Sequence, residues 1–224
     1  MGYYIDLKSI SIDAYKDILK NKTLIPSWKV LENDIDENLS ILKTHNINNL
    51  DELLITLKEK TKIQEFSRQS GLPENYLAVL KRVVKGYRPK PNRIKDFACI
   101  GKDIVLKLEK IGIKNTLKLY DEILTNEKRN QLSRKSGIND NEIMKLTKLT
   151  DLSRIRWVNH TFAYVLLKAG YDTVEKVANA DYKEMYDTIK KLNEERKIYK
   201  AHIGANDMKM VIESAQNLEL EIEY

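Results

Sequence analysis

A run of positive charge between residues 81 and 95 offers the clearest chemistry in this sequence. It reads KRVVKGYRPKPNRIK and contains no acidic residue. Its cations are Lys81, Arg82, Lys85, Arg88, Lys90, Arg93 and Lys95. Pro89 and Pro91 favour an extended backbone, and Tyr87 offers a ring on which a base could stack. Because clustered cations neutralise phosphates, the run indicates nucleic-acid binding; the alternative is a solvated linker kept polar for solubility.

The sequence shows no side-chain pattern for catalysis or metal binding. His45, His160 and His202 lie far apart and belong to no HxxxH, HExxH or CxxC pattern. Cys99, the single cysteine, stands next to apolar residues, which favours a small buried side chain over a reactive thiol. No glycine-rich phosphate loop or Ser/His/Asp arrangement is visible. We therefore expect a protein that is not an enzyme and has no metal, cofactor or small-molecule substrate.

The composition is that of a folded, helical protein. Of 224 residues, 42% are hydrophobic and 32% are charged, with a formal net charge of +6 and only eight glycines and four prolines. No apolar run approaches the roughly 18 residues that cross a bilayer, and the N-terminus lacks the pattern of a secretory signal. A single cysteine fits a reducing compartment. We expect a cytoplasmic protein that does not contact membranes.

The sequence also repeats itself. SRQSGLPENYLAVL begins at Ser67 and SRKSGINDNEIMKL begins at Ser133, and the same offset of 66 residues relates Asn49 to Asn115. A third, looser copy follows at an offset of 58, where LLKAGYDT matches LEKIGIKN. Agreement over separate stretches at one offset predicts a duplication, and the looser match at the second offset adds a third copy of the same helical unit.

Each copy is predicted to join its helices through left-handed turns and side-chain caps. The residues expected to end the first helix of each copy are Asn46, Gly112 and Gly170. Those expected to cap the next helix are Asn49, Asn115 and Thr173. Those expected to end a later helix are Gly71, Gly137 and Gly204. The fold class is therefore all-α, with three degenerate repeats.

A helical extension is predicted to precede the first copy. Ser11 to Asn21 is typical of a short helix, and Pro26-Ser27 predicts a turn that starts another helix at Trp28. Trp28 is expected to anchor this segment to the core. We divide the chain into the extension (1–34), repeat 1 with the basic linker (35–92), repeat 2 (93–150) and repeat 3 with an acidic C-terminal tail (151–224).

Three stretches of the sequence carry a resemblance to a known family. They are DFACIGKDIVLKLEKIGIKNT, RNQLSRKSGINDNEIMKL and LTDLSRIRWVNHTFAYVLLKAGYDTVEKVANADYKEM. From about Arg93 to Tyr224 the chain resembles the DUF4332 family, whose members look like tandem helix–hairpin–helix domains and whose function is unknown. In the wider helix–hairpin–helix class, a Gly-apolar-Gly turn lets the N–H groups of the following helix contact a phosphate without reading sequence.

That resemblance makes the turns between helices the candidate contact points. The turn of repeat 2 reads CIGK and contains Gly101 and Lys102, which we take as the main candidates together with the basic run. The turn of repeat 3 reads WVNH and keeps neither glycine, and the turn of repeat 1 reads NDI between acidic residues, which repel phosphate. At most one of the three turns therefore fits a phosphate.

Arg154, Arg156 and Asn159 are a secondary candidate at the third turn, beside Trp157. They could hold a phosphate or an acidic partner. In the alternative that we favour, Trp157 and Ile155 belong to the core and the arginines cover carbonyl groups at helix ends.

Two functions follow from these patterns. The first is sequence-independent, non-catalytic binding of DNA through a helix–hairpin–helix turn and the adjacent basic stretch. The second is a protein–protein interaction scaffold whose hairpins have degenerated and no longer bind DNA. The lost glycines and the acidic C-terminal tail favour the second, whereas the clustered cations favour the first.

Overall fold

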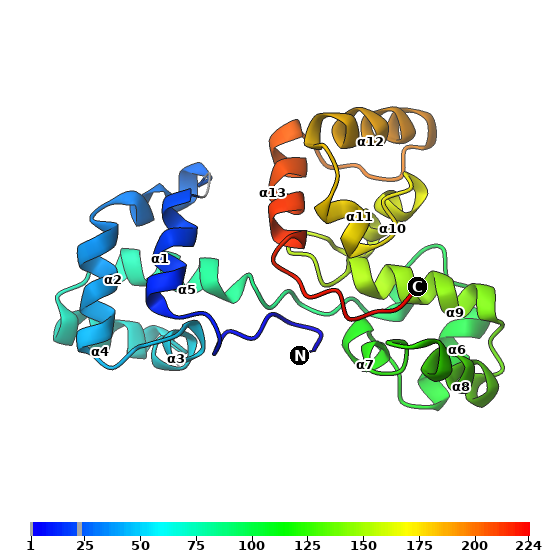
Figure 1. The fold of residues 1–224 in the computed structure, drawn as a ribbon, viewed down its shortest axis with the longest axis horizontal. Coiled ribbons are helices and arrows are strands. Elements are labelled where there is room, and N and C mark those ends of the chain that lie inside the picture. The colour runs from blue at the N-terminus through cyan, green and yellow to red at the C-terminus, as the bar shows by residue number, and fades with distance from the viewer. Residues whose placement is uncertain (1, 22–23) are drawn as a thin grey trace. The chain divides into compact units, whose positions relative to one another are not determined.

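The fold is all-α, as the sequence predicts. The computed structural model describes residues 2–21 and 24–224, and all regular elements in these ranges are helices (Figure 1). The extended pairings in these ranges are two isolated antiparallel bridges, Ser11 with Asn49 and Arg93 with Asn115. Within the same ranges, no helix has the length and apolar character needed to cross a membrane.

Two compact units divide the chain. Asp6–Arg88 forms one, here called the N-terminal unit, and residues 2–5 with Pro89–Tyr224 form the other, the C-terminal unit. Tyr3 is buried in the C-terminal unit, where its hydroxyl is 2.7 Å from the hydroxyl of Thr116. The first residues of the chain therefore contribute to the core of the C-terminal unit.

Six helices make up the described part of the N-terminal unit. They are α1 (Ile12–Asn21), the 3₁₀ helix η1 (Pro26–Glu32), α2 (Ile35–Thr44), α3 (Leu50–Thr56), α4 (Lys60–Ser70) and α5 (Glu74–Lys85). Helix α1 confirms the predicted helix after Ser11. The next helix begins at Pro26 rather than at Trp28, because the fixed φ of proline suits the first helical position. Trp28 is 3% exposed, which confirms its predicted anchoring role.

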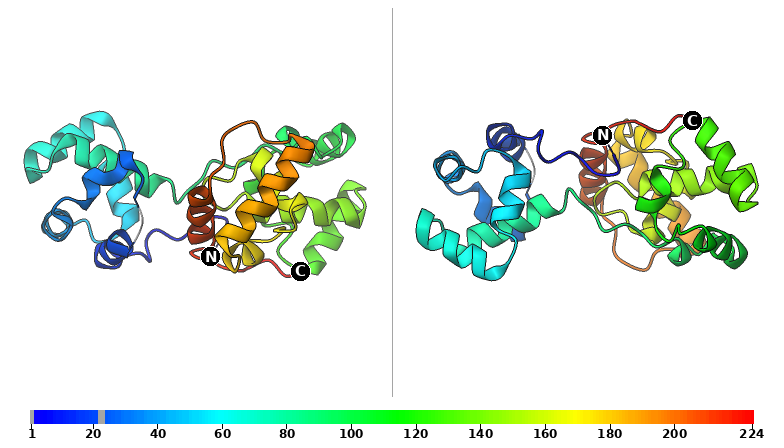
Figure 2. Two further views of the ribbon diagram at one scale, coloured as in Figure 1. Left: turned by 90° about the horizontal axis from the view of Figure 1, so that it is seen from above. Right: turned by 90° about the horizontal axis from the view of Figure 1, so that it is seen from below.

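The C-terminal unit contains nine helices in its described residues. They are η2 (Ile94–Asp96), α6 (Lys102–Lys110), α7 (Thr116–Tyr120), α8 (Asn126–Ser136), α9 (Asp140–Leu152), α10 (His160–Lys168), α11 (Val174–Ala178), α12 (Tyr182–Arg196) and α13 (Ala205–Ala215). Helix α13 packs against α11 and α12, and α9 packs against α7, α8 and α10 (Figures 1 and 2). Short helices joined by capped turns thus enclose one core.

The predicted helix ends and caps are confirmed at most positions. Asn46, Gly112 and Gly170 have φ values of 61°, 85° and 89°, in the left-handed region where a Cβ is unfavourable. The caps of α3, α7 and α11 are Asn49, Asn115 and Thr173, and each side chain accepts a hydrogen bond from the backbone N–H three residues later. Local capping chemistry therefore sets where these helices begin and end.

The prediction for Gly204 is wrong. Gly204 does not end a helix; it lies at the N-cap of α13 with φ −116°, and its N–H donates to the carboxylate of Asp207 at 2.8 Å. The preceding helix, α12, ends earlier, at Arg196, and its C-cap Lys197 takes a left-handed φ of 49°. A lysine can close a helix in this way, so the glycine in the sequence was a misleading signal for the helix end.

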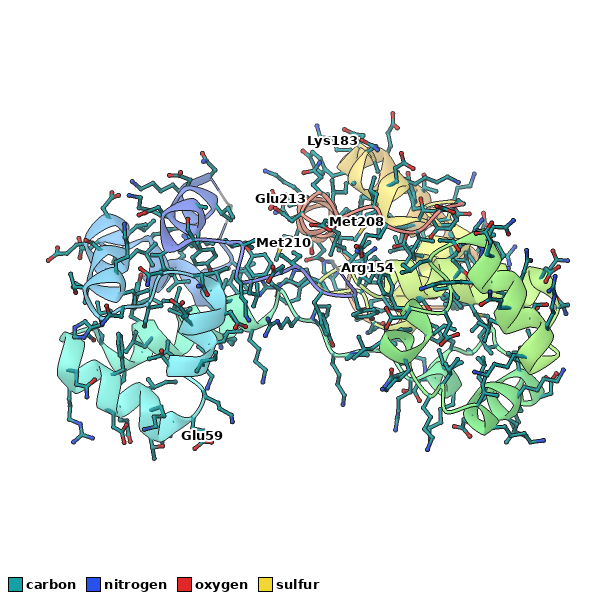
Figure 3. All side chains as sticks on the ribbon, turned by 60° about the horizontal axis from the view of Figure 1, so that its bottom comes forward. Glu59, Arg154, Lys183, Met208, Met210 and Glu213 are labelled. Carbon is teal, nitrogen blue, oxygen red and sulfur yellow. The ribbon has the colours of Figure 1, made fainter. Side chains whose placement is uncertain are left out.

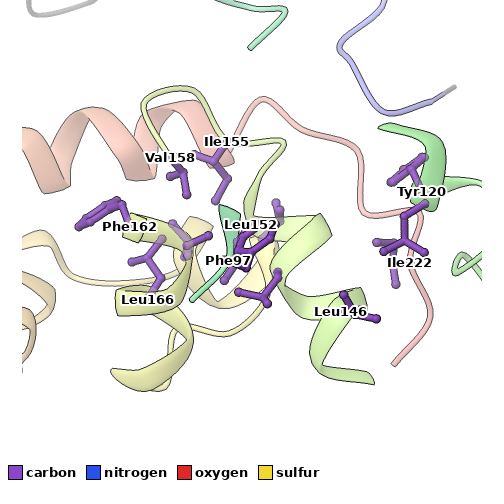
Figure 4. Packing of buried hydrophobic residues seen from close by; sticks show 14 of the residues in the cluster. Phe97, Tyr120, Leu146, Leu152, Ile155, Val158, Phe162, Leu166 and Ile222 are labelled. Carbon is purple, nitrogen blue, oxygen red and sulfur yellow. The ribbon is translucent and has the colours of Figure 1, made fainter. Parts of the chain in front are cut away.

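Buried aliphatic and aromatic side chains fill the C-terminal unit. Figure 4 shows Phe97, Leu152 and Phe162 near Ile155 and Val158, which come from the turn between α9 and α10. Ile155 and Val158 are 0% and 5% exposed. Burial of these two residues fixes the turn on the core and decides which of its other side chains face solvent.

Candidate functional site

The predicted basic run crosses from one unit to the other at residues 88 and 89. The cations in the N-terminal unit are Lys81, Arg82, Lys85 and Arg88, and those in the C-terminal unit are Lys90, Arg93 and Lys95. Three cations of the N-terminal unit already donate hydrogen bonds within that unit. Lys81 donates to the carbonyl of Lys58, Arg82 to the carbonyl of Ser27, and Arg88 to the carboxylate of Asp51. The cations of the C-terminal unit are therefore the better candidates for an external anion.

Tyr87 is not available for stacking, contrary to the prediction. Its side chain is 7% exposed, and its ring lies edge-on to Tyr15 at 6.3 Å between centroids. Val83 and Val84, near the end of α5, are also buried. Tyr87 continues the buried face of α5, so its ring packs inward.

A surface groove in the C-terminal unit brings together residues that the sequence placed in two separate candidate sites. Its volume is about 470 Å³. The lining residues are Pro89, Lys90, Pro91, Asn92, Arg93, Asp96, Trp157, Val158, Asn159 and His160. Lys90 and Arg93 come from the basic run, whereas Asn159 comes from the secondary candidate at the third turn. We call this feature the 90/157 groove.

Asn92 joins the two sides of the 90/157 groove. Its amide nitrogen donates to the hydroxyl of Ser153 at 2.9 Å and to the carbonyl of Val158 at 3.4 Å. Its amide oxygen accepts from the backbone N–H of His160 at 3.1 Å. Its own N–H donates to the hydroxyl of Thr116 at 3.1 Å. Sequence reasoning missed this residue, because its partners lie 24 to 68 positions away.

The cations of the 90/157 groove differ in their partners. Lys90 is exposed and forms no hydrogen bond or ion pair with the residues the structure describes. The Nε of Arg93 donates to Asp96 at 2.8 Å, while 63% of the Arg93 side chain stays exposed. This hydrogen bond holds the pKa of the Asp96 carboxyl below its usual range, so Asp96 is ionised at neutral pH and offsets part of the positive charge.

Trp157 lies on the surface, and the prediction that it belongs to the core is wrong. It is 46% exposed, and its φ of 76° is positive. The guanidinium of Arg156 lies 4.5 Å from the centre of the indole ring. Because Ile155 and Val158 face the core, a tight turn leaves residue 157 facing solvent. The expectation for Ile155 is confirmed.

Arg154 is buried and does not form part of a surface site, which corrects its place among the secondary candidates. It is 2% exposed, and its side chain donates a hydrogen bond of 2.9 Å to Asp151. Figure 3 labels Arg154 among the side chains of the C-terminal unit. Its other donors reach the carbonyl of Glu219 at 2.8 Å and that of Tyr3 at 3.4 Å. All three guanidinium nitrogens thus have acceptors, which link α9 to both ends of the chain.

The carboxylate of Asp151 completes this buried network. Its second oxygen accepts from the backbone N–H of Val174 and from the hydroxyl of Tyr224, both at 2.9 Å. Burial, with the charge of Asp151 beside it, raises the pKa of the Tyr224 hydroxyl above its usual range. The sequence signal for the network is an Asp-x-x-Arg spacing across the end of α9, in which Arg154 lies in the turn that follows the helix.

Arg156 is also buried, at 6% exposure. Its backbone N–H donates to the hydroxyl of Ser214 on α13 at 3.0 Å, and its guanidinium stacks on Trp157.

Asn159 is exposed, but its side-chain oxygen accepts from the N–H of Phe162 at 2.9 Å and so caps α10. Together with Asn92, which binds the N–H of His160, it occupies donors that a phosphate would need at the start of α10.

The turn at Gly101, before α6, differs from the turn before α10 because no side chain caps its helix. Gly101 is exposed at the N-cap of α6 and no side chain caps this helix. Lys102 is exposed and makes no ion pair within the described residues. A Cβ built on Gly101 would lie 2.6 Å from the carboxylate of Asp103, so this acidic side chain reaches over the turn. Neither Gly101 nor Lys102 lines the 90/157 groove.

Side chains that could bind a metal ion do not gather in the part of the chain that the structure describes. No group of three or more His, Cys, Asp or Glu side chains is close enough to hold a metal ion in these ranges. Cys99 is half-buried, and burial raises the pKa of its thiol, which keeps it protonated at neutral pH.

Comparison with known protein families gives a match over most of the C-terminal unit. The model of a domain of unknown function, DUF4332, matches residues 98–218, which is more than half of the chain. The chain belongs to the DUF4332 family. The matched DUF4332 region includes α6 to α13 and the turns at Gly101 and Trp157. No match to the chain is found among curated proteins or among solved structures.

Proposed function

We propose that this DUF4332 protein binds nucleic acid, DNA in the first instance, without sequence preference and without catalysis. The observation that carries the proposal is the 90/157 groove, in which Lys90 and Arg93 lie with an exposed tryptophan and an exposed asparagine. Cations supply phosphate contacts, and an exposed aromatic ring supplies a surface for a base. A cytoplasmic location is part of the same proposal.

The turn at Gly101 is proposed as a second phosphate contact in the same unit. The N–H groups at the start of α6 have no side-chain cap, and the adjacent Lys102 is exposed. Uncapped amides at a helix start favour anions because the partial charge of the helix dipole there is positive. Asp103 opposes this contact, and its side chain must turn away when a phosphate binds.

We further propose that the chain is built from three degenerate helix–hairpin–helix-like repeats. Matching hydrogen bonds support the first two. Ser67 donates to the carbonyl of Leu72, and Ser133 donates in the same way to Ile138. In addition, the residue that caps α3 and the residue that caps α7 each form an isolated bridge with a segment nearer the N-terminus. The third repeat has diverged most, and its helix α12 has 15 residues where α8 has 11.

A salt titration tests the binding function. The protein is titrated into a fluorescent DNA oligonucleotide at several salt concentrations, and binding is followed by anisotropy. The double variant Lys90→Ala/Arg93→Ala is expected to bind more weakly, with the slope of log K against log salt reduced by about 1.5. The matched control, Lys183→Ala/Lys209→Ala, removes two exposed cations of the same unit outside the groove and should alter affinity much less. An absence of binding by the wild type at micromolar protein and low salt refutes the function.

A protein-interaction scaffold is the second candidate, and two observations favour it. The first N–H groups of α10 are taken by Asn92 and Asn159, so this turn has few donors for a phosphate. Leu106, on α6, is also 59% exposed. In this account the protein associates through an apolar contact that includes Leu106. Sedimentation should then show self-association that Leu106→Glu abolishes, and a strictly monomeric wild type argues against this form of the scaffold.

A further inference from the structure

Trp157 has a conformation that its own packing does not explain. Its φ of 76° lies in the left-handed region, where a bulky residue is an outlier and glycine is favoured. A strained residue is commonly kept when its side chain fills the core, but this indole is 46% exposed. Strained backbone conformations are found most often at functional sites, where the surrounding structure holds the residue in place.

The surroundings of Trp157 hold the turn firmly on both sides. The N–H of Arg156 donates to Ser214 on α13, and the carbonyl of Val158 accepts from Asn92. The indole is therefore presented to solvent on a fixed backbone. The guanidinium of Arg156 lies 4.5 Å from the ring centre, a cation–π contact that orients the ring. A ring that is already ordered loses little conformational freedom when a ligand binds to it.

The 90/157 groove adds phosphate chemistry beside this ring. Lys90 and Arg93 line the same groove as Trp157, and both side chains are exposed. Its volume of about 470 Å³ lies within the range of roughly 300–1,000 Å³ found for small-ligand pockets. A nucleotide presents what such a groove would contact: an aromatic base and a negatively charged backbone.

We propose that Trp157 stacks on an unpaired base, so that the 90/157 groove selects single-stranded or locally unpaired nucleic acid over continuous duplex. This inference rests on the nucleic-acid binding proposed above and names its substrate class. In a duplex each base is covered on both faces by its neighbours, so an indole can stack only where the stack is open. The cations hold the backbone of the same strand.

A pair of probes separates stacking from phosphate contact. The first is a fluorescein-labelled oligothymidylate of about 12 nucleotides, within the site sizes of single-strand binders. The second is an abasic oligomer of the same length, which keeps the phosphates but has no bases. The wild type is expected to bind oligothymidylate about tenfold more tightly than the abasic oligomer, the size of one good stacking contact. It should also prefer oligothymidylate to a duplex of equal length.

Two variants remove the ring and keep the turn. Trp157→Gly suits a positive φ, and Trp157→Asn provides a second variant, because asparagine also tolerates this region. In both, the affinity for oligothymidylate should fall to that for the abasic oligomer, while circular dichroism confirms a folded protein. Quenching of tryptophan fluorescence by oligothymidylate should also disappear, leaving the unquenched signal of the buried Trp28.

Each outcome bears on a different proposal. A wild type that binds both single-stranded probes equally, or folded variants that keep the preference for oligothymidylate, overturns stacking by Trp157 and leaves phosphate binding intact. A preference for duplex over both single-stranded probes overturns the assigned substrate class. If no probe binds even at low salt, the proposed function itself fails, and this inference fails with it.

Discussion

The turns before α6 and α10 each lead into a helix of nine residues but differ in structure. At the first, Gly101 is exposed and no side chain caps the helix. At the second, Asn159 and Asn92 accept from the N–H groups of the helix, and Trp157 takes the strained conformation. The first turn presents bare backbone, whereas the second presents a side chain on a locked backbone. The comparison teaches that a turn between helices can present bare backbone or an ordered side chain, depending on which residues bind the N–H groups of the following helix.

The largest effect is expected for the buried ion pair of Asp151 and Arg154, which lies next to the turn before α10. Replacing Asp151 with alanine leaves the guanidinium of Arg154 buried without its carboxylate partner. The free energy of unfolding should fall by about 3 to 5 kcal/mol in urea denaturation. The exposed Asp140 at the start of α9 is the control, and its alanine variant should lose less than about 1 kcal/mol. If Asp151→Ala lowers the free energy of unfolding by less than about 1 kcal/mol, the buried network of Asp151 and Arg154 does not stabilise the fold as described.

Removing the link between the two sides of the groove comes next. Asn92→Ala loses the side-chain bonds to Ser153, Val158 and the N–H of His160. Because two or more part-buried groups lose their partner, stability should fall by about 2 kcal/mol. Thermal or urea unfolding measures the loss, with the exposed Asn141→Ala as the matched control. Equal effects of the two variants would mean that Asn92 does not hold the turn.

Glycine substitutions should have opposite signs at the two turns. Trp157→Gly relieves the strain of a positive φ and should stabilise the protein by about 1 kcal/mol. Cys99 occupies the corresponding position before α6, has no positive φ and is half-buried. Cys99→Gly should therefore destabilise by about 1 kcal/mol, through lost packing and backbone entropy. If both substitutions raise the free energy of unfolding, or both lower it, the two turns do not differ in backbone conformation as described.

The smallest effects concern the caps. Asn159→Ala removes a hydrogen bond to the N–H of Phe162 and should cost about 1 kcal/mol in unfolding experiments. Gly101→Ala removes no side-chain hydrogen bond and should cost about 0.5 kcal/mol, less than Asn159→Ala, because glycine is favoured over alanine at an N-cap and Asp103 can move from the added methyl group. If Gly101→Ala costs as much as Asn159→Ala, the turn before α6 is not the bare one described.

The sequence predicted the features that depend on near neighbours. The caps at Asn49, Asn115 and Thr173 and the left-handed ends at Gly112 and Gly170 follow from residue type and spacing within one turn. The prediction for Gly204 was wrong because it depended on where α12 ends, and the C-cap of α12 is a lysine in the left-handed conformation. Local chemistry was therefore a sound guide to helix limits, except where an unlikely residue type closed the helix.

The 90/157 groove could be predicted only in part. Lys90, Arg93 and Asn159 were candidates from charge and position, but nothing local shows that Asn92 binds residues 61 and 68 positions away. The exposure of Trp157 and the burial of Arg154 reversed the usual preferences of these residue types. Both depend on which neighbours in the turn face the core, and that is decided by long-range packing.

The most direct test of the central claim is photocrosslinking of the wild type to an oligonucleotide that contains 4-thiothymidine, with the attached peptides identified by mass spectrometry. The account predicts crosslinks at Trp157 or His160 and at residues 89–93, which line one groove. These crosslinks should decrease with added salt and in the Lys90→Ala/Arg93→Ala variant. Crosslinks confined to residues outside the groove, or none at low salt, would contradict it.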